Sequence, residues 1–233
     1  MSKSRKAEVL VQPKKRRITP GVVVVVVLLL VLAGGVGVQY WRSNSGVTVE
    51  NADAPEPAII TGPGTDGQGV TFGKADAKAT IDVYLDFRCP HCEEFEAESG
   101  SAINSLVDEG KVKATYWPMD FVSKDNSPRL ANAWACAAAE GKPRSYSDAL
   151  FGSFEKAWSE KQLLALGKAL KINTPEFETC VKTNGQAKWV ESIQGAAEKR
   201  GVSGTPTVFV NGKKLNDDQL NPQAIMVAIA AAA

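Results

Sequence analysis

The sequence predicts an α/β domain with an inserted helical subdomain, preceded by an apolar N-terminal segment and a linker. Strands at 81–87 and 111–117 flank a helix at 90–107, and a third strand at 207–210 opens a hairpin. The block between the second and third strands is too long for a single crossover helix, so it should form a helical subdomain. The composition fits one medium-sized globular domain, because 44% of the 233 residues are hydrophobic.

Each predicted element rests on its own pattern. Residues 81–87 alternate apolar and polar side chains, which is typical of a strand. The apolar spacing becomes helical from Pro90 to about Val107, with a candidate kink at Gly100-Ser101. Asn211-Gly212 is a strong hairpin signal, and a last helix is expected over 221–233. The helical patterns of the inserted block lie at 128–140, 146–158, 160–170, 175–182 and 186–199.

Charge is distributed unevenly along the chain. The first 20 residues hold seven basic residues and one acidic residue, whereas the remainder holds 20 basic and 25 acidic residues. A basic tail on a mildly acidic body indicates membrane topology rather than a surface for nucleic acid. We therefore expect residues 1–20 to be a cytoplasmic tail and expect no nucleic-acid partner.

Residues 21–40 are predicted to be a transmembrane anchor. No charge occurs between Arg17 and Arg42, and the apolar run is close to the ~17–25 residues that a spanning helix needs. The basic cluster at 14–17 would keep the N-terminus inside and place the body outside the cell. A cleaved signal peptide is the alternative, because Ala33-Gly34-Gly35 is an acceptable cleavage site. With the anchor, the protein would be a single-pass cell-membrane protein whose folded body is extracytoplasmic.

Residues 41–69 are predicted to be a flexible linker. Pro55, Pro57 and Gly62-Pro63-Gly64 lie in this stretch, which has few side chains to bury. The folded domain is expected at 70–233, with the helical insertion at about 125–185.

The chemistry is concentrated at Cys89-Pro90-His91-Cys92, where a predicted strand meets a predicted helix. Cys89 takes the N-cap position, and Pro90 suits the first position of the helix. The unpaired N–H groups and the dipole of the first turn stabilise a thiolate at Cys89, and a protonated His91 would add positive charge nearby. Cys92 can close a disulfide with Cys89. The pattern predicts a redox-active cysteine pair that needs no cofactor.

Two other interpretations of the motif are weaker. Zinc would need two more ligands, but His91 is the only histidine, and Cys136 and Cys180 are not in C-x-x-C spacing. A purely structural disulfide between Cys89 and Cys92 would close little chain and contribute little stability. No metal is therefore expected.

Cys136 and Cys180 fall in two different predicted helices of the inserted block. In an oxidising compartment two such cysteines are expected to form a structural disulfide. A pair of free core cysteines is the alternative.

Three further motifs occur in order along the chain. They are Asp-Phe-Arg-Cys-Pro-His-Cys at 86–92, the alanine-rich helix at 133–142, and Gly-Val-Ser-Gly-Thr-Pro-Thr-Val-Phe-Val-Asn-Gly at 201–212. In these motifs and their order the sequence resembles the DsbA-type thiol:disulfide oxidoreductases. The resemblance, to the branch that includes membrane-anchored actinobacterial members, covers 70–233 and implies a thioredoxin fold. It implies that Cys89 attacks, that Cys92 resolves, and that Thr205-Pro206 forms a cis-proline loop that binds substrate. It also implies exported substrate proteins with reduced cysteines and a quinone-linked membrane reoxidant of the DsbB or vitamin-K-epoxide-reductase type.

The predicted function is an extracytoplasmic oxidase that introduces disulfides into exported proteins through Cys89 and Cys92. An isomerase or reductase is one alternative, and a membrane-anchored peptide-binding module with an incidental C-x-x-C is another. Some thioredoxin-fold enzymes carry a buried acid six residues before the first cysteine, but Val83 stands there in this chain. Whether Asp82 or Asp86 assists proton transfer is left open.

Overall fold

The structure, a computed structural model, describes residue 49 and residues 54–231. The predicted tail at 1–20 and the predicted anchor at 21–40 lie outside the described residues. Among the residues that are described, no helix combines the length and the apolar character that crossing a membrane requires.

A mixed sheet of six strands runs through the described domain in the order β1-β2-β4-β3-β5-β6. The parallel pair is β3–β4, and the other neighbouring strands are antiparallel. The strands are β1 (Ile59–Thr61), β2 (Val70–Gly73), β3 (Ala79–Leu85), β4 (Val112–Pro118), β5 (Thr207–Val210) and β6 (Lys213–Lys214). Because β3 lies between β4 and β5, the end of β3 meets the start of β5, where Tyr84 pairs with Thr207.

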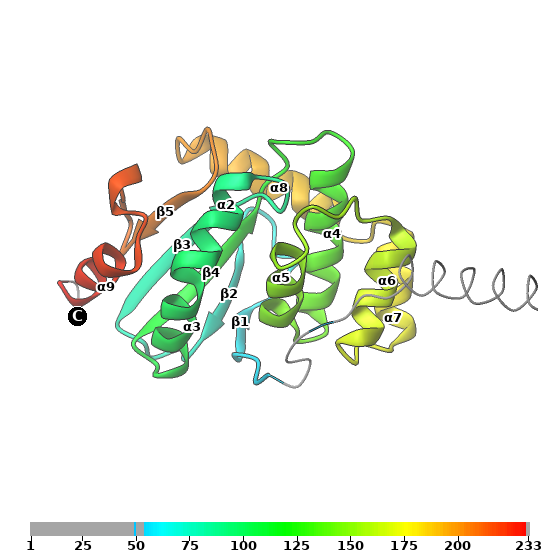
Figure 1. Cartoon of the computed structure of the whole chain (residues 1–233), viewed down its shortest axis with the longest axis horizontal. Helices are drawn as coiled ribbons and strands as arrows, with labels where there is room; N and C mark the ends of the chain where they lie inside the picture. Colours follow the sequence, from blue (N-terminus) through cyan, green and yellow to red (C-terminus); the bar gives the residue numbers. More distant parts are fainter. Residues whose placement is uncertain (1–48, 50–53, 232–233) are drawn as a thin grey trace, which may run out of the picture. The chain divides into compact units, whose positions relative to one another are not determined.

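The connection from β3 to β4 is a helix interrupted by a wider turn. It comprises α2 (Pro90–Phe95), a π-helical turn η1 (Glu96–Gly100) and α3 (Ser101–Asp108). Figure 1 shows α2 and α3 in front of the sheet and α8 behind it. Gly100-Ser101, where the sequence offers a candidate kink, is the junction between η1 and α3. A Cβ on Gly100 would lie 2.7 Å from Oε2 of Glu96, so a larger residue at this position would require the Glu96 side chain to move.

The insertion between β4 and β5 is helical, as predicted from the sequence. Its helices are α4 (Asn126–Ala139), α5 (Pro143–Phe151), α6 (Glu160–Ala169), α7 (Pro175–Lys182) and α8 (Ala187–Lys199). Helix α5 begins and ends earlier than the predicted 146–158, because Pro143 opens it and Gly152 follows its last turn. The chain ends in a short 3₁₀ turn, η2 (Asp217–Gln219), and α9 (Pro222–Ala230).

The ordered domain starts before residue 70, which corrects the predicted extent of the linker. Strand β1 lies within the predicted linker and pairs with β2. The carboxylate of Glu56 accepts hydrogen bonds from the backbone N–H groups of Arg144 and Ser145, both at 3.0 Å. A helix start has unpaired N–H groups that favour an anion, so Glu56 ties the segment before β1 to α5 despite its proline-rich composition.

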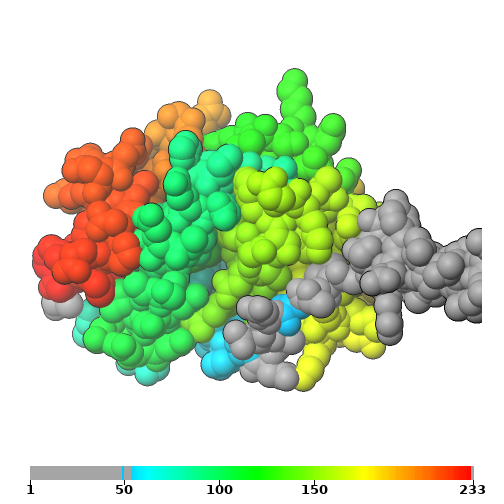
Figure 2. All heavy atoms as spheres, in the orientation of Figure 1, coloured from blue at the N-terminus to red at the C-terminus, as the bar shows by residue number. Residues whose placement is uncertain are grey.

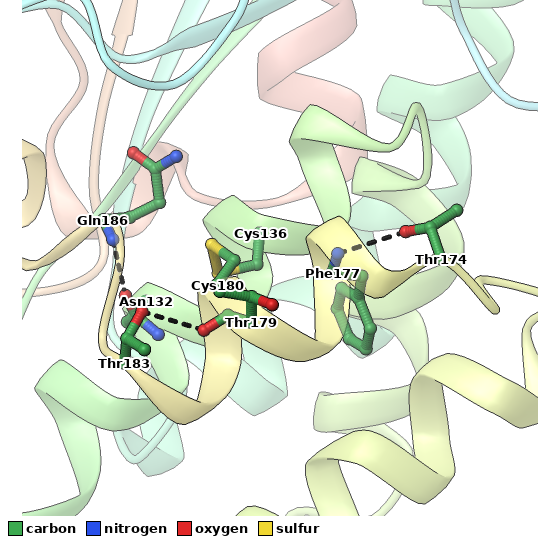
Figure 3. Close-up of a disulfide and its surroundings, with 8 residues drawn as sticks. All are labelled: Asn132, Cys136, Thr174, Phe177, Thr179, Cys180, Thr183 and Gln186. Carbon is green, nitrogen blue, oxygen red and sulfur yellow. Dashed lines mark hydrogen bonds between the residues drawn. A yellow bond between two sulfur atoms is a disulfide. The ribbon is translucent and has the colours of Figure 1, made fainter.

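A disulfide between Cys136 and Cys180 joins α4 to α7, with an S–S distance of 2.01 Å (Figure 3). Cys136 lies on α4, a helix whose residues from Leu130 to Ala138 are all buried. Beside the disulfide, the backbone N–H of Gln186 donates to Oδ1 of Asn132 at 2.8 Å. The two bonds hold the end of the insertion against its central helix.

Replacing both cysteines of this disulfide by alanine should lower the free energy of unfolding. The bond joins residues 44 positions apart, and the chain-entropy estimate for a loop of that length is about 4 kcal/mol. Denaturant unfolding of the Cys136→Ala/Cys180→Ala variant measures the loss. An unchanged unfolding midpoint would contradict the prediction, and the reactivity of Cys89 should stay the same.

Candidate active site

Cys89 lies at the N-cap of α2, directly after the turn that follows β3. Its backbone is extended, with φ −88° and ψ 118°, and its carbonyl accepts from the N–H groups of Cys92 and Glu93 at 3.0 and 3.1 Å. Pro90 occupies the first turn, where its missing N–H costs no hydrogen bond. The motif therefore starts the helix as the sequence predicts, with the Cys89 sulfur beside the free end of the helix.

Hydrogen-bond donors around the Cys89 sulfur favour its thiolate. The pKa of Cys89 is lowered to about 5, first by the hydrogen bond from the Cys92 thiol and against the opposing effect of burial. The Thr205 side chain and the backbone N–H groups of Cys92 and His91 lower this pKa further. In the thiol form, Sγ of Cys89 donates to the Thr205 carbonyl at 3.2 Å. Cys89 is therefore the thiol of the pair that is ionised at neutral pH.

Cys92 has the opposite environment. Its side chain is fully buried, and burial raises its pKa far above the usual value for a thiol, with the neighbouring Cys89 adding to the effect. The backbone N–H of Asp86 donates to the Cys92 sulfur at 3.4 Å. Both cysteines are free thiols in the structure. The proton of the pair therefore stays on Cys92 while Cys89 carries the charge.

The loop before β5 faces the cysteines. The peptide bond between Thr205 and Pro206 is cis, the geometry that the resemblance implies. The Thr207 hydroxyl donates to the Gly204 carbonyl at 2.8 Å, which closes the loop on itself. Because β5 pairs with β3, this loop reaches the Cys89 sulfur from a position more than 110 residues further along the chain.

His91 contributes to the site differently from the expectation. Its ring is exposed, and Nδ1 lies 3.4 Å from Oε2 of Glu94 on the next turn. The contribution of His91 to the lowered pKa of Cys89 comes from its backbone N–H. The physical reason is direction, since the first-turn N–H groups point at the N-cap sulfur while the exposed ring pairs with a carboxylate.

The two acids left open by the sequence have distinct surroundings. Asp82 forms an ion pair with Arg200 at 2.9 Å, and the Trp117 indole donates to it at 3.5 Å. Asp86 is fully buried, and burial raises its pKa. Its carboxylate accepts from the backbone N–H groups of Arg88 at 2.8 Å and Val122 at 2.9 Å. Asp86 thus joins the turn before Cys89 to the loop after β4, and its own N–H contacts the Cys92 sulfur.

Arg88 is a site residue that the sequence reasoning missed. Its Nη1 donates to the carbonyls of Phe154 and Lys156, at 2.6 and 3.2 Å, and its guanidinium lies 5.2 Å from the centre of the Phe154 ring. The residue before Cys89 therefore holds the loop that follows α5. The sequence signals Arg88 only by its position next to the motif, because both groups that accept its hydrogen bonds are backbone carbonyls of a distant segment.

A second cluster of acids lies one turn beyond the motif. The pKa of Glu96 is raised to about 8, mainly by burial and also by the charge of Asp148, while a hydrogen bond with Tyr116 opposes the rise. Burial also raises the pKa of Asp148 to about 6. Both carboxyl groups line a pocket of about 330 Å³ beside η1.

The arrangement can exchange a disulfide. A thiolate at Cys89 can attack a disulfide, and the pair can close to a disulfide that accepts two electrons from other thiols. In the part of the chain that the structure describes, no three His, Cys, Asp or Glu side chains are grouped to hold a metal ion.

Known proteins resemble this chain in sequence. A thioredoxin family model matches residues 65–230. The thiol:disulfide interchange protein DsbA of Escherichia coli K12 is 28% identical over 147 residues, which cover 61% of this chain and 68% of that protein. The disulfide bond formation protein D of Bacillus subtilis 168 is 28% identical over 169 residues, which cover 69% of this chain and 75% of that protein.

Solved structures resemble it in fold. MdbA, a thiol-disulfide oxidoreductase from Corynebacterium diphtheriae, superposes with a TM-score of 0.62 at 22% identity, over 76% of this chain and 98% of that one. The reduced disulfide bond oxidoreductase DsbG from Mycobacterium tuberculosis gives a TM-score of 0.59 at 25% identity, over 78% and 92%. The described domain has a thioredoxin-like fold with a helical insertion.

Replacing Asp86 by asparagine should destabilise the turn that carries the motif. The amide group would turn an N–H donor toward one of the two backbone N–H groups, leaving that group unpaired and buried, at a cost of about 1–3 kcal/mol. Denaturant unfolding measures the loss in the free energy of unfolding, and alkylation kinetics measure any change in the reactivity of the Cys92 thiol. The Asp125→Asn variant, at an exposed position, is the matched control. Equal stability of Asp86→Asn and wild type would contradict the role given to Asp86.

Glu96 should make stability depend on pH. Its pKa in the folded protein is about 8 and should fall to about 4.3 on unfolding, so the folded state binds the extra proton between these values. Stability contributed by the neutral carboxyl is therefore lost as pH rises from about 4.3 to 8. The difference in melting temperature between Glu96→Gln and wild type should grow in favour of the variant from pH 5 to pH 8.

The exposed Glu191→Gln on α8 is the control for this pH series. Its difference from wild type should stay constant across the same range. A constant difference for Glu96→Gln would contradict the assignment of a neutral, buried carboxyl.

Proposed function

The chain belongs to the thioredoxin family as a DsbA-like thiol:disulfide oxidoreductase, and from this premise we propose that it is an oxidase that introduces disulfides into exported proteins. The observation that carries the direction is the opposite pKa shift of the two active-site thiols. Interactions that stabilise the Cys89 thiolate stabilise the reduced pair, and a stable reduced pair makes the disulfide a better oxidant.

The reaction proceeds through a mixed disulfide at Cys89. A substrate thiolate attacks the Cys89 sulfur, a new S–S bond forms, and the Cys89–Cys92 bond breaks. Cys92 leaves and takes up a proton, since burial favours its thiol form. A second substrate thiolate then attacks the substrate sulfur, so the substrate disulfide forms and Cys89 departs as a stabilised thiolate. Two electrons pass from the substrate thiols to the cysteine pair.

Thr205 and Pro206 are proposed to receive the substrate. They lie beside the Cys89 sulfur, and Thr205 supplies a carbonyl at 3.2 Å. A substrate segment in extended form would exchange backbone hydrogen bonds with this loop while its cysteine reaches Cys89. The backbone N–H of His91 and the helix start at Pro90 complete the proposed catalytic group.

Location and partners follow from the family and from the N-terminal sequence. We place the domain outside the cytoplasm, tethered by residues 21–40, with reduced exported proteins as substrates. The electrons would pass on to a quinone-linked membrane protein of the DsbB or vitamin-K-epoxide-reductase type. The uncharged run from 18 to 41 and the basic residues before it support the tether.

The two cysteines should differ sharply in alkylation and in turnover. In the reduced protein, Cys89 should be alkylated first, with a rate that rises through pH 5, because its pKa is about 5. Cys89→Ser should abolish oxidation of a reduced dithiol peptide. Cys92→Ser, mixed with the disulfide form of that peptide, should accumulate a mixed disulfide, because the Cys89 thiolate attacks the peptide disulfide and releases one peptide thiolate while no Cys92 is present to resolve the product. Mass spectrometry of trapped peptides identifies the modified cysteine.

The Cys136→Ala/Cys180→Ala variant is the control, since it should retain dithiol oxidation. First alkylation at Cys92 would overturn the assignment of roles. A reduction potential near thioredoxin's about −270 mV, rather than DsbA's about −120 mV, would favour a reductase over an oxidase. Normal cellular function of Cys89→Ser would favour the peptide-binding module.

A further inference from the structure

A groove of about 470 Å³ opens beside the Thr205-Pro206 loop, between the helix that starts at Pro90 and the segment that precedes α9. It shares Thr205, Pro206 and His91 with the active site. Figure 2 shows the red-orange atoms of the segment after β6 beside the blue-green atoms of α2. The groove is lined by His91, Glu94, Phe95, Glu98, Thr205, Pro206, Asp217 and Leu220.

The floor and the rim of this groove differ in chemistry. Phe95 is buried, and Pro206 and Leu220 are half-buried, so the floor offers apolar surface to a side-chain stem. Glu94, Glu98 and Asp217 are exposed and form an acidic rim. Lysine and arginine have an apolar stem and a charged head, which matches this division.

The negative charge of the rim is poorly compensated. Glu94 pairs with the His91 ring, but neither lysine nor arginine lines the groove. Among the described residues, Glu98 and Asp217 have no ion pair within 4.0 Å. A cationic side chain in the groove would therefore meet two carboxylates that have no partner of their own.

The position of the groove determines which part of a substrate reaches it. A substrate cysteine must approach the Cys89 sulfur, which is 3.2 Å from the Thr205 carbonyl at the edge of the groove. In an extended peptide, side chains two residues apart point to the same side. The side chain two residues before or after the substrate cysteine is therefore the one that enters.

This proposal rests on the proposed function. We propose that Glu98 and Asp217 select substrates by charge, so that the enzyme favours substrate cysteines that have a lysine or arginine two residues before or after them. Together, the two exposed carboxylates should change the rate constant by about threefold for each unit of charge on the entering side chain. Neither residue touches the reacting sulfurs, so they affect specificity and leave the exchange chemistry unchanged.

The test compares three reduced peptides, each with two cysteines. The peptides differ only at the positions two residues from each cysteine, where the first has lysine, the second glutamine and the third glutamate. The oxidised full-length chain, in mild detergent, is mixed with each peptide, and acid-quenched samples give the rate constant for peptide disulfide formation. We expect the lysine peptide to react about tenfold faster than the glutamate peptide at low salt, with glutamine between them. The ratio should shrink at 0.5 M salt, which screens exposed charges.

The Glu98→Gln/Asp217→Asn variant should bring the lysine-to-glutamate ratio to within about twofold while the glutamine peptide reacts at its wild-type rate. The control Asp76→Asn/Glu191→Gln removes the same charge from exposed positions outside the groove and should keep the ratio. If the Glu98→Gln/Asp217→Asn variant keeps a tenfold lysine-to-glutamate ratio, or if the wild-type enzyme oxidises all three peptides at equal rates, the proposed charge selectivity is wrong while the proposed function stands. Failure to oxidise any peptide overturns the proposed function as well.

Discussion

The site depends on where the negative charge of a thiolate can be held. The Cys89 sulfur sits where the Cys92 thiol, Thr205 and the N–H groups of the first helical turn converge. The Cys92 sulfur, three residues later, is enclosed by the core and keeps its proton. One short motif thus contains two thiols with opposite preferences. This asymmetry distinguishes a redox pair from half of a zinc site or from a structural disulfide.

The remainder of the fold holds these donors in place. The central position of β3 sets the cysteine turn and the Thr205 loop side by side, since β5 pairs along β3. Asp86 and Arg88 then fasten that turn to two loops, one after β4 and one after α5. The buried carboxylate of Asp86 and the guanidinium of Arg88 both bind backbone groups, so they hold the shape of these loops directly.

Elements that are determined by nearby residues could be predicted from the sequence, whereas elements that depend on distant residues could not. The motif helix and the hairpin at Asn211-Gly212 have local signals and were predicted at or near their positions. The early start of the domain was missed because β1 is only three residues long and its partner lies across a loop. The hydrogen bond from the Arg144 N–H in the first turn of α5 to Glu56 joins residues 88 positions apart, and no pattern in either segment predicts it.

The chemistry could be predicted from the sequence, because C-x-x-C spacing at a strand-to-helix junction already places one sulfur at a helix start and a second within reach. The sequence also determined that Cys136 and Cys180 were candidates for pairing, from their number and their place in the helical block. Tertiary structure alone decided how the site is tuned. Burial of Cys92 and the approach of Thr205 both arise from contacts across the fold. Electrostatic effects depend on distance and burial in space, and a linear pattern specifies neither.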